Sequence, residues 1–197
     1  MTMKIFDLYD VSEIQVEDPG LKRYINVEPR LVLKTHGRDR ARFEDAKVNV
    51  VERLARLLGC AGHRGKKNKI MLSVASGKFN KNMKIVLEAL KIIHERTKQN
   101  PVQVLVKAIE AGAPVEEITV IEYGGARYPQ SVDCSPTRRI NLALRNMVHG
   151  ASDKAFGKKV TIAQALANEI ILATQQSSES FAWQKRNEAE KQAASAR

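Results

Sequence analysis

The segment spanning residues 121–145 constrains the fold most, because it joins a tight turn to a marked helix start. Gly124 and Gly125 stand between two strand-like runs, and glycine adopts the positive φ values of a two-residue hairpin turn without steric cost. Ser135 and Pro136 then follow in the order of an N-cap residue and a first helical residue. The segment therefore predicts a β-hairpin that leads directly into a helix.

Much of the remaining chain shows the periodicity of amphipathic helices, with apolar residues three and four positions apart. Hydrophobic residues make up 43% of the chain but aromatic residues only 5%, which favours a helical core of aliphatic side chains. The sequence predicts a mainly α fold, a six-helix bundle with a protruding β-hairpin arm at about 117–133. The helices are expected at about 46–60, 82–97, 101–112, 136–149, 161–177 and 179–197.

The first part of the chain differs from the rest. Residues 1–44 are punctuated by proline and glycine and hold no sustained helical period, which predicts an irregular, extended N-terminal arm. We expect this arm to bind RNA, and residues 45–197 to form a helical domain that includes the hairpin and the C-terminal helix. Within that domain, residues 63–69 are expected to form a basic loop, and residues 70–81 are assigned no strand.

The chain carries a large excess of positive charge, with a formal net charge of +11 and a pI near 9.8. This excess favours a polyanionic partner, of which nucleic acid is the commonest and an acidic membrane surface is the alternative. No apolar run approaches the ~20 residues of a membrane span, and no signal peptide is evident. We therefore expect a cytoplasmic protein without a membrane partner.

Basic residues gather in several clusters that suit contacts with phosphates. Alternate arginines in the arm would project on one side of an extended chain, although a solvated charge run is the alternative. Phe79 lies among lysines and could stack on a base, but packing on the core is the interpretation that we favour. The predicted RNA-binding residues are Arg30, Lys34, Arg38, Arg40, Arg42, Lys47, Arg64, Lys66, Lys67, Lys69, Lys78, Lys81, Lys84, Arg138, Arg139, Arg145, Lys158 and Lys159.

Arg138 and Arg139 are the strongest single candidates for contact with an anion. They lie in the first turn of a predicted helix, where a cation opposes the helix dipole, so they indicate an anionic partner outside the helix. Beside the glycine turn, Tyr123, Arg127 and Tyr128 could stack on unpaired bases. The alternative for these three residues is cross-strand packing that steadies the hairpin.

Patterns of catalysis and metal binding are weak in this sequence. It lacks a glycine-rich phosphate fingerprint after a strand, a nucleophile elbow and a pair of acids in an apolar setting. Cys60 and His63 have a spacing that suits a metal, but no second pair of ligands accompanies them, and Cys134 belongs to no such pattern. We therefore expect no enzyme, no cofactor, no metal and no small-molecule substrate.

Longer motifs follow one another in a characteristic order. They are DPGLKRYINVEPR, KVNVVERL, TKQNPVQVLVKAIE, YGGARY, VDCSPTRRINLALR and SFAWQKRNEAEKQAASAR. Through these motifs, nearly the whole chain resembles the universal small-subunit ribosomal protein family seven, in its archaeal and eukaryotic form. One position departs from the family's pattern, which usually has a glycine and two basic residues before the second helix. Here that place holds Gly77, Lys78 and Phe79.

The resemblance implies a six-helix bundle with a hairpin arm, and a structural constituent of the small ribosomal subunit. It implies a primary binder of ribosomal RNA that organises the 3′ major domain of the subunit head, beside neighbouring small-subunit proteins. The family's RNA-facing helix arginines fall on Arg138 and Arg139, and its N-terminal arm on the stretch through Arg42. The hairpin tip, which reaches toward exit-site tRNA and the mRNA exit path, falls on Tyr123, Gly124, Gly125, Arg127 and Tyr128.

Two other functions are compatible with the charge and the helical pattern. A helical DNA-binding or chromatin protein would share both features, but it would prefer duplex DNA to structured RNA. An RNA-modifying enzyme would also be basic, yet it would need the cofactor or acid–base pattern that the sequence lacks.

Overall fold

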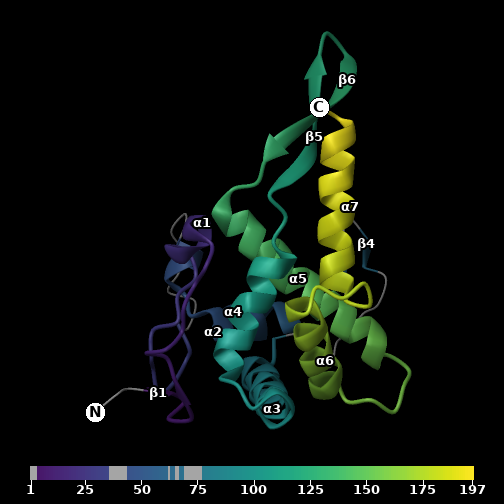
Figure 1. Cartoon of the computed structure of the whole chain (residues 1–197). Helices are drawn as coiled ribbons and strands as arrows, with labels where there is room; N and C mark the ends of the chain where they lie inside the picture. Colours follow the sequence, from purple (N-terminus) through teal and green to yellow (C-terminus); the bar gives the residue numbers. More distant parts are fainter. Residues whose placement is uncertain (1–3, 36–43, 62, 65–66, 69–76) are drawn as a thin grey trace.

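The computed structural model describes residues 4–35, 44–61, 63–64, 67–68 and 77–197, in which a helical bundle carries one protruding hairpin (Figure 1). Helix α6 is the centre of the bundle and packs against α3, α4 and α5. The predicted mainly α fold is confirmed. The principal helices are α2 (Val50–Leu58), α3 (Phe79–Thr97), α4 (Pro101–Gly112), α5 (Pro136–Ala155), α6 (Ile162–Thr174) and α7 (Phe181–Ser195).

The starts of α2, α4, α6 and α7 follow capping signals of the sequence, whereas α3 begins at Phe79 and not at the expected residue 82. At the start of α6 the Thr161 hydroxyl accepts the Gln164 backbone N–H, and the Gln164 side chain accepts the Thr161 N–H, which is a capping box. Ser135 occupies the N-cap position of α5 and Pro136 its first position, as predicted, but the Ser135 hydroxyl makes no capping hydrogen bond. A capping residue can therefore mark where a helix starts, as Ser135 does, without making the capping hydrogen bond.

Gly150 lies inside α5, although the sequence predicted that this helix would end near residue 149. A Cβ atom at Gly150 would lie 2.7 Å from the Phe181 Cβ and 2.9 Å from the Glu169 Cδ. Only glycine leaves room for α5 to approach α6 and the start of α7 this closely. Tertiary packing has overridden the helix-ending tendency of glycine, which costs only about 1 kcal/mol in a helix interior.

A buried carboxylate ties the same three helices together. Glu169 on α6 is fully buried and accepts hydrogen bonds from the Lys154 Nζ at 2.7 Å, the Ser180 hydroxyl at 2.8 Å and the Ala182 N–H at 3.1 Å. A buried charge is tolerated when it is paired and hydrogen-bonded, and these three donors meet that need. Because Ser180 is the N-cap of α7, the network fixes where α7 begins.

The hairpin consists of β5 (Glu116–Tyr123) and β6 (Ala126–Asp133), paired antiparallel and joined by the two glycines. Gly124 has a φ of 58° and Gly125 a φ of 81°, as a tight primed turn requires. Pro129 lies opposite Val120 and is exposed, as expected for a strand residue without an N–H donor. In Figure 1 the hairpin extends beyond the bundle, and α7 runs beside its lower part.

Polar contacts fix the base of the hairpin to α7. Glu190 accepts the Val115 N–H at 3.1 Å, and Arg197 forms an ion pair with Glu116. Glu116 also accepts a hydrogen bond from the Ser131 hydroxyl of the opposite strand at 3.2 Å. The C-terminal helix therefore acts as a brace for the hairpin rather than as a free tail.

The N-terminal arm is more structured than predicted. It contains β1 (Lys4–Ile5), paired with β2 (Tyr9–Asp10), and the one-turn helix α1 (Pro19–Lys22). The prediction of an irregular segment was wrong for these elements, because the capping pair Asp18 and Pro19 that begins α1 resembles part of a turn, and the two-residue strands show no period. Four of them join the bundle core: Ile5, Leu21, Ile25 and Leu33.

Two further short elements follow the arm. A 3₁₀ turn, η1 (Glu44–Lys47), leads into α2, and two-residue strands β3 (His63–Arg64) and β4 (Lys67–Asn68) pair antiparallel within the predicted basic loop. None of the helices in the described part of the chain has the length and hydrophobicity needed to span a bilayer.

Candidate nucleic-acid interface

The start of α3 gathers three of the predicted RNA-binding lysines around one surface hollow. Lys34 comes from the arm, Lys78 directly precedes α3, and Lys81 lies in the first turn of α3. The hollow has a volume of about 380 Å³ and is also lined by Gly77, Phe79 and Asn80. Segments far apart in the sequence thus bring their cations to one place.

The backbone at this helix start adds to the positive potential. Lys78 is the N-cap residue of α3, its side chain makes no capping hydrogen bond, and the first turn holds no acid. The amino end of a helix carries a partial positive charge and exposed N–H donors, which suit a phosphate. The lysines and the amino end of α3 therefore both attract an anion to the hollow.

Phe79 packs partly against the hydrophobic core, as the favoured interpretation of the sequence predicted. The Lys34 Nζ lies 5.8 Å from the centroid of its ring, within the range of a cation–π contact. The ring thus holds one lysine of the hollow in place, although a basic residue is usual at this position in the family that the sequence resembles.

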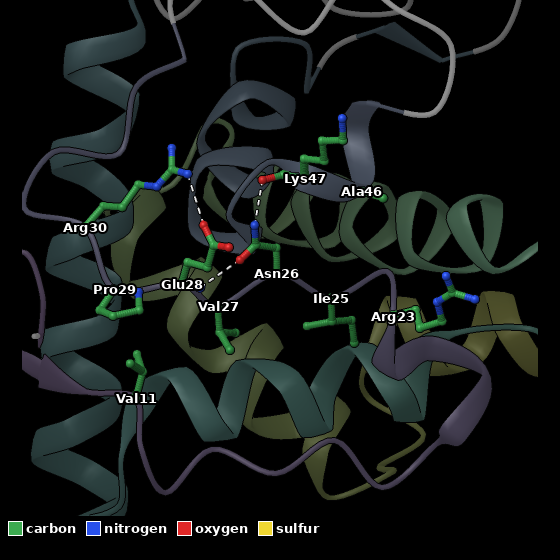
Figure 2. A pocket seen from close by; sticks show the side chains of 10 residues that line it. All are labelled: Val11, Arg23, Ile25, Asn26, Val27, Glu28, Pro29, Arg30, Ala46 and Lys47. Atoms are coloured by element: carbon green, nitrogen blue, oxygen red, sulfur yellow. Dashed lines mark hydrogen bonds and ion pairs between the residues drawn. The ribbon is translucent and has the colours of Figure 1, made fainter.

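A second and larger hollow lies between the arm and η1, with a volume of about 660 Å³ (Figure 2). It brings together the predicted residues Arg30 and Lys47. It also includes Arg23, a residue that the sequence reasoning missed. The signal for Arg23 was present in the motif DPGLKRYINVEPR, but no local pattern distinguished it from other surface arginines.

The paired arginines at the start of α5 both have partners within the chain. Arg138 bonds Glu117 at the hairpin base through its Nη2 at 2.6 Å, and this bond raises the pKa of the Arg138 guanidinium. The side chain of Arg138 stays 54% exposed, so one side of it remains open to a further anion.

Arg139 is held more firmly. Its Nη2 donates to the Asp18 Oδ2 at 2.9 Å, its Nε donates to the Pro114 carbonyl at 3.2 Å, and only 14% of its side chain is exposed. The expected anionic partner exists, but it belongs to the arm of the chain itself. Asp18 lies 121 positions away, so no local pattern could have revealed the pair. Contact of Arg139 with RNA stays a prediction.

The hairpin tip presents its aromatic residues to solvent. Tyr123 is 81% exposed and Tyr128 is 58% exposed. Tyr128 lies directly opposite Ile121, and Tyr123 opposite Ala126, so the two tyrosines are not a cross-strand pair. Arg127 lies 3.7 Å from Glu122, which is its partner across the hairpin. The tip therefore offers two accessible rings, as stacking on unpaired bases requires.

The other predicted residues are spread over the surface or lie outside the described residues. Lys84 on α3, Arg145 on α5, and Lys158 and Lys159 in the loop after α5 are exposed. Arg64 is on β3 and Lys67 is on β4, where only the backbone is described. The predictions for Arg38, Arg40, Arg42, Lys66 and Lys69 fall outside the described residues.

One buried arginine has a structural place that the sequence did not reveal. Arg53 on α2 donates to the Tyr24 carbonyl at 3.2 Å and to the Asn141 Oδ1 at 2.8 Å. Burial lowers the pKa of its guanidinium. Arg53 therefore joins the arm, α2 and α5 from inside and takes no part in the exposed basic surface.

Comparison with known proteins decides the family. The model of the family described as Ribosomal protein S7p/S5e matches residues 22–197. The chain belongs to this family. Its relatives include proteins named small ribosomal subunit protein uS7 from three archaea. Those from Nanoarchaeum equitans, Methanosphaera stadtmanae and Methanococcus maripaludis are 50%, 47% and 46% identical, and each alignment covers 100% of both chains.

Membership in the S7p/S5e family gives the chain a structural and non-enzymatic role in the ribosome. The resemblance drawn from the sequence motifs is confirmed, including its archaeal form. Among the residues that the structure describes, no group of three or more histidines, cysteines or acids is arranged to hold a metal. The basic hollows and the exposed hairpin tip are the candidate RNA-contacting surfaces.

Proposed function

We propose that the chain is a primary RNA-binding protein of the small ribosomal subunit in the cytoplasm, and that it organises the 3′ major domain that forms the subunit head. The family and the uS7 relatives support a place in the small subunit. The net charge of +11 supports a polyanionic partner. In this role the protein neutralises phosphates across a folded RNA junction and contacts neighbouring small-subunit proteins.

The observation that carries the proposal is the lysine hollow at the start of α3. Within the described residues, none of Lys34, Lys78 and Lys81 forms an ion pair, so their charges are available. The uncapped helix start adds N–H donors at the same place. A phosphate seated there would meet lysines from two segments of the chain, which fixes the arm relative to the bundle.

The hairpin supports a second part of the proposal, in which it reaches toward exit-site tRNA and the mRNA exit path. Its tip extends beyond the bundle, and its two tyrosines are accessible to unpaired bases (Figure 1). The brace from α7 to Glu116 would hold the tip at a defined position while the bundle is anchored on ribosomal RNA.

The test of the RNA anchor compares two double variants with equal loss of charge. Lys78→Ala with Lys81→Ala is expected to weaken binding to a head-domain RNA fragment. It should also lower the slope of log K against log salt by about 0.7–0.9 for each lost phosphate contact. Lys91→Ala with Lys191→Ala removes two exposed helix lysines outside the hollow and is expected to change the slope little.

Equal slopes for the two double variants would contradict the assignment, because they would show a general charge effect instead of a site. The same assay with duplex DNA as competitor separates the alternative function. A chromatin protein would prefer the duplex, whereas the proposed ribosomal protein prefers structured RNA.

A further inference from the structure

The hollow between the arm and η1 has walls that are fixed by hydrogen bonds before any ligand arrives. The Asn26 side chain donates to the Lys47 carbonyl at 2.6 Å and accepts the Glu28 N–H at 2.7 Å. The Asn26 carbonyl accepts the Val50 N–H at 2.9 Å, and the Asn49 side chain donates to the Glu28 carbonyl at 3.0 Å. The arm and the start of α2 therefore form one preformed wall.

The lining of this hollow combines an apolar surface with cations. Figure 2 shows Val11 at the lower left, Val27 and Ile25 in the middle and Arg23 at the right, with Arg30 and Lys47 above them. Its volume of about 660 Å³ lies within the range of small-ligand pockets, about 300–1,000 Å³. The remaining lining residues are Arg23, Asn26, Glu28, Pro29 and Ala46.

The charges around the hollow favour an anionic ligand. Three cations line it, and the one acid, Glu28, is already paired with Arg30 at 3.0 Å. The Lys47 Nζ lies 3.9 Å from the nearest Glu44 oxygen and is largely exposed. In the described part of the chain, the guanidinium of Arg23 has no hydrogen bond or ion pair. Arg23 is therefore the cation best placed to receive a phosphate.

We propose that this hollow binds one unpaired nucleotide of RNA, with its base against Val27 and its phosphate at Arg23. The inference rests on the proposed RNA-binding function and adds a specific subsite to it. The guanidinium of arginine matches phosphate oxygens in a bidentate geometry. The Val27 side chain gives one face of the base an apolar contact, and an arginine guanidinium plane can stack on a base.

Glu28 favours a nucleotide over an acidic peptide as the ligand. Its carboxylate is an acceptor, and the amino group of a base can donate to it. The acidic side chains of a peptide bring no donor to this position and would be repelled by it. A nucleotide thus brings a donor on its base and an anion for the unpaired cation, whereas the side chains of an acidic peptide bring the anion alone.

The test uses the full chain, a structured head-domain RNA fragment and three variants. Arg23→Ala is expected to weaken RNA binding and to lower the salt slope by about 0.7–0.9, the value for one phosphate contact. Ala46→Trp fills the hollow without changing charge, and it is expected to weaken binding about tenfold by excluding the base, which corresponds to about 1.4 kcal/mol, with the slope unchanged. Lys22→Ala removes an exposed neighbouring cation outside the hollow and is expected to stay within about twofold of wild type.

The outcomes separate this inference from the proposed function. If the wild-type chain binds the RNA and both Arg23→Ala and Ala46→Trp bind as tightly, the nucleotide site is overturned and the RNA-binding function stands. If the wild-type chain does not bind the RNA, the proposed function fails. Normal RNA binding by both variants with loss of a neighbouring protein from reconstituted subunits would assign the hollow to a protein segment instead. A thermal melt shows whether the Ala46→Trp variant is folded. If that variant is unfolded, Arg23→Ala, which changes a surface residue, decides the question.

Discussion

Replacing Gly150 with alanine tests whether the close approach of α5, α6 and α7 depends on a missing side chain. In a helix interior alanine is favoured over glycine by about 1 kcal/mol, so propensity alone predicts a more stable protein. The structure predicts the opposite. The new Cβ would lie 2.7 Å from the Phe181 Cβ and 2.9 Å from the Glu169 Cδ, distances that require a neighbour to move.

The size of the loss follows from how firmly the neighbours are held. Overpacking a core costs about 1–3 kcal/mol. We expect the upper value of about 3 kcal/mol, because the Phe181 Cβ moves only with the start of α7, and Glu169 is fixed by three hydrogen bonds. After subtraction of the helix-propensity gain, the free energy of unfolding should fall by about 2 kcal/mol. For a chain of this size that corresponds to a Tm lower by about 4–8 °C.

Gly112→Ala provides the matched control. A Cβ at Gly112 would lie 3.6 Å from the Ala143 and Ala182 Cβ atoms and 3.7 Å from the Met147 Cε, which are ordinary van der Waals distances. This variant is expected to gain about 0.4–1 kcal/mol, because alanine restricts the unfolded chain. Thermal and urea unfolding of both variants measure the difference. Gly150→Ala with a stability equal to that of Gly112→Ala would refute the packing argument.

Two further predictions concern the start of α5. Arg139→Lys should lower the free energy of unfolding by about 1 kcal/mol, because lysine cannot reach both Asp18 and the Pro114 carbonyl. Urea unfolding of the variant and of wild type measures the loss, and equal free energies of unfolding would contradict the double role of Arg139. Burial raises the pKa of the Cys134 thiol to about 11, so Cys134 stays protonated at pH 8 and gains its reactive thiolate only near pH 11. Maleimide should therefore label the exposed Cys60 much faster at pH 8, and equal rates would contradict this burial.

The helices and the hairpin could be predicted because their signals are local. Apolar spacing, the Thr161–Gln164 capping box and the paired glycines each act within a few residues of the element that they define. The signals of the N-terminal arm are not local. Leu21 and Leu33 are buried because the bundle lies beneath them, and no period in the sequence records that contact.

The candidate site was predictable as chemistry but not as geometry. Charge and residue type singled out Lys34, Lys78 and Lys81 as candidates, and only the fold shows that they surround one hollow. Charge alone could not distinguish fully exposed cations from Arg139, which is mostly buried and bonds Asp18. A residue whose partner is distant in the sequence cannot be assigned its role from the residues next to it.

Because the hairpin is long, a small change of angle at its base moves its tip by a much larger distance. Strands of eight residues span roughly 27 Å at about 3.4 Å per residue. A tilt of about 5° at the base would therefore displace the tip by about 2 Å, enough to break or make a hydrogen bond. Two ion pairs hold this base in place. Glu116 pairs with Arg197, just beyond the end of α7, and Glu117 pairs with Arg138 at the start of α5. The loss of a charge in either ion pair could therefore change the angle of the hairpin and displace Tyr123 at its tip.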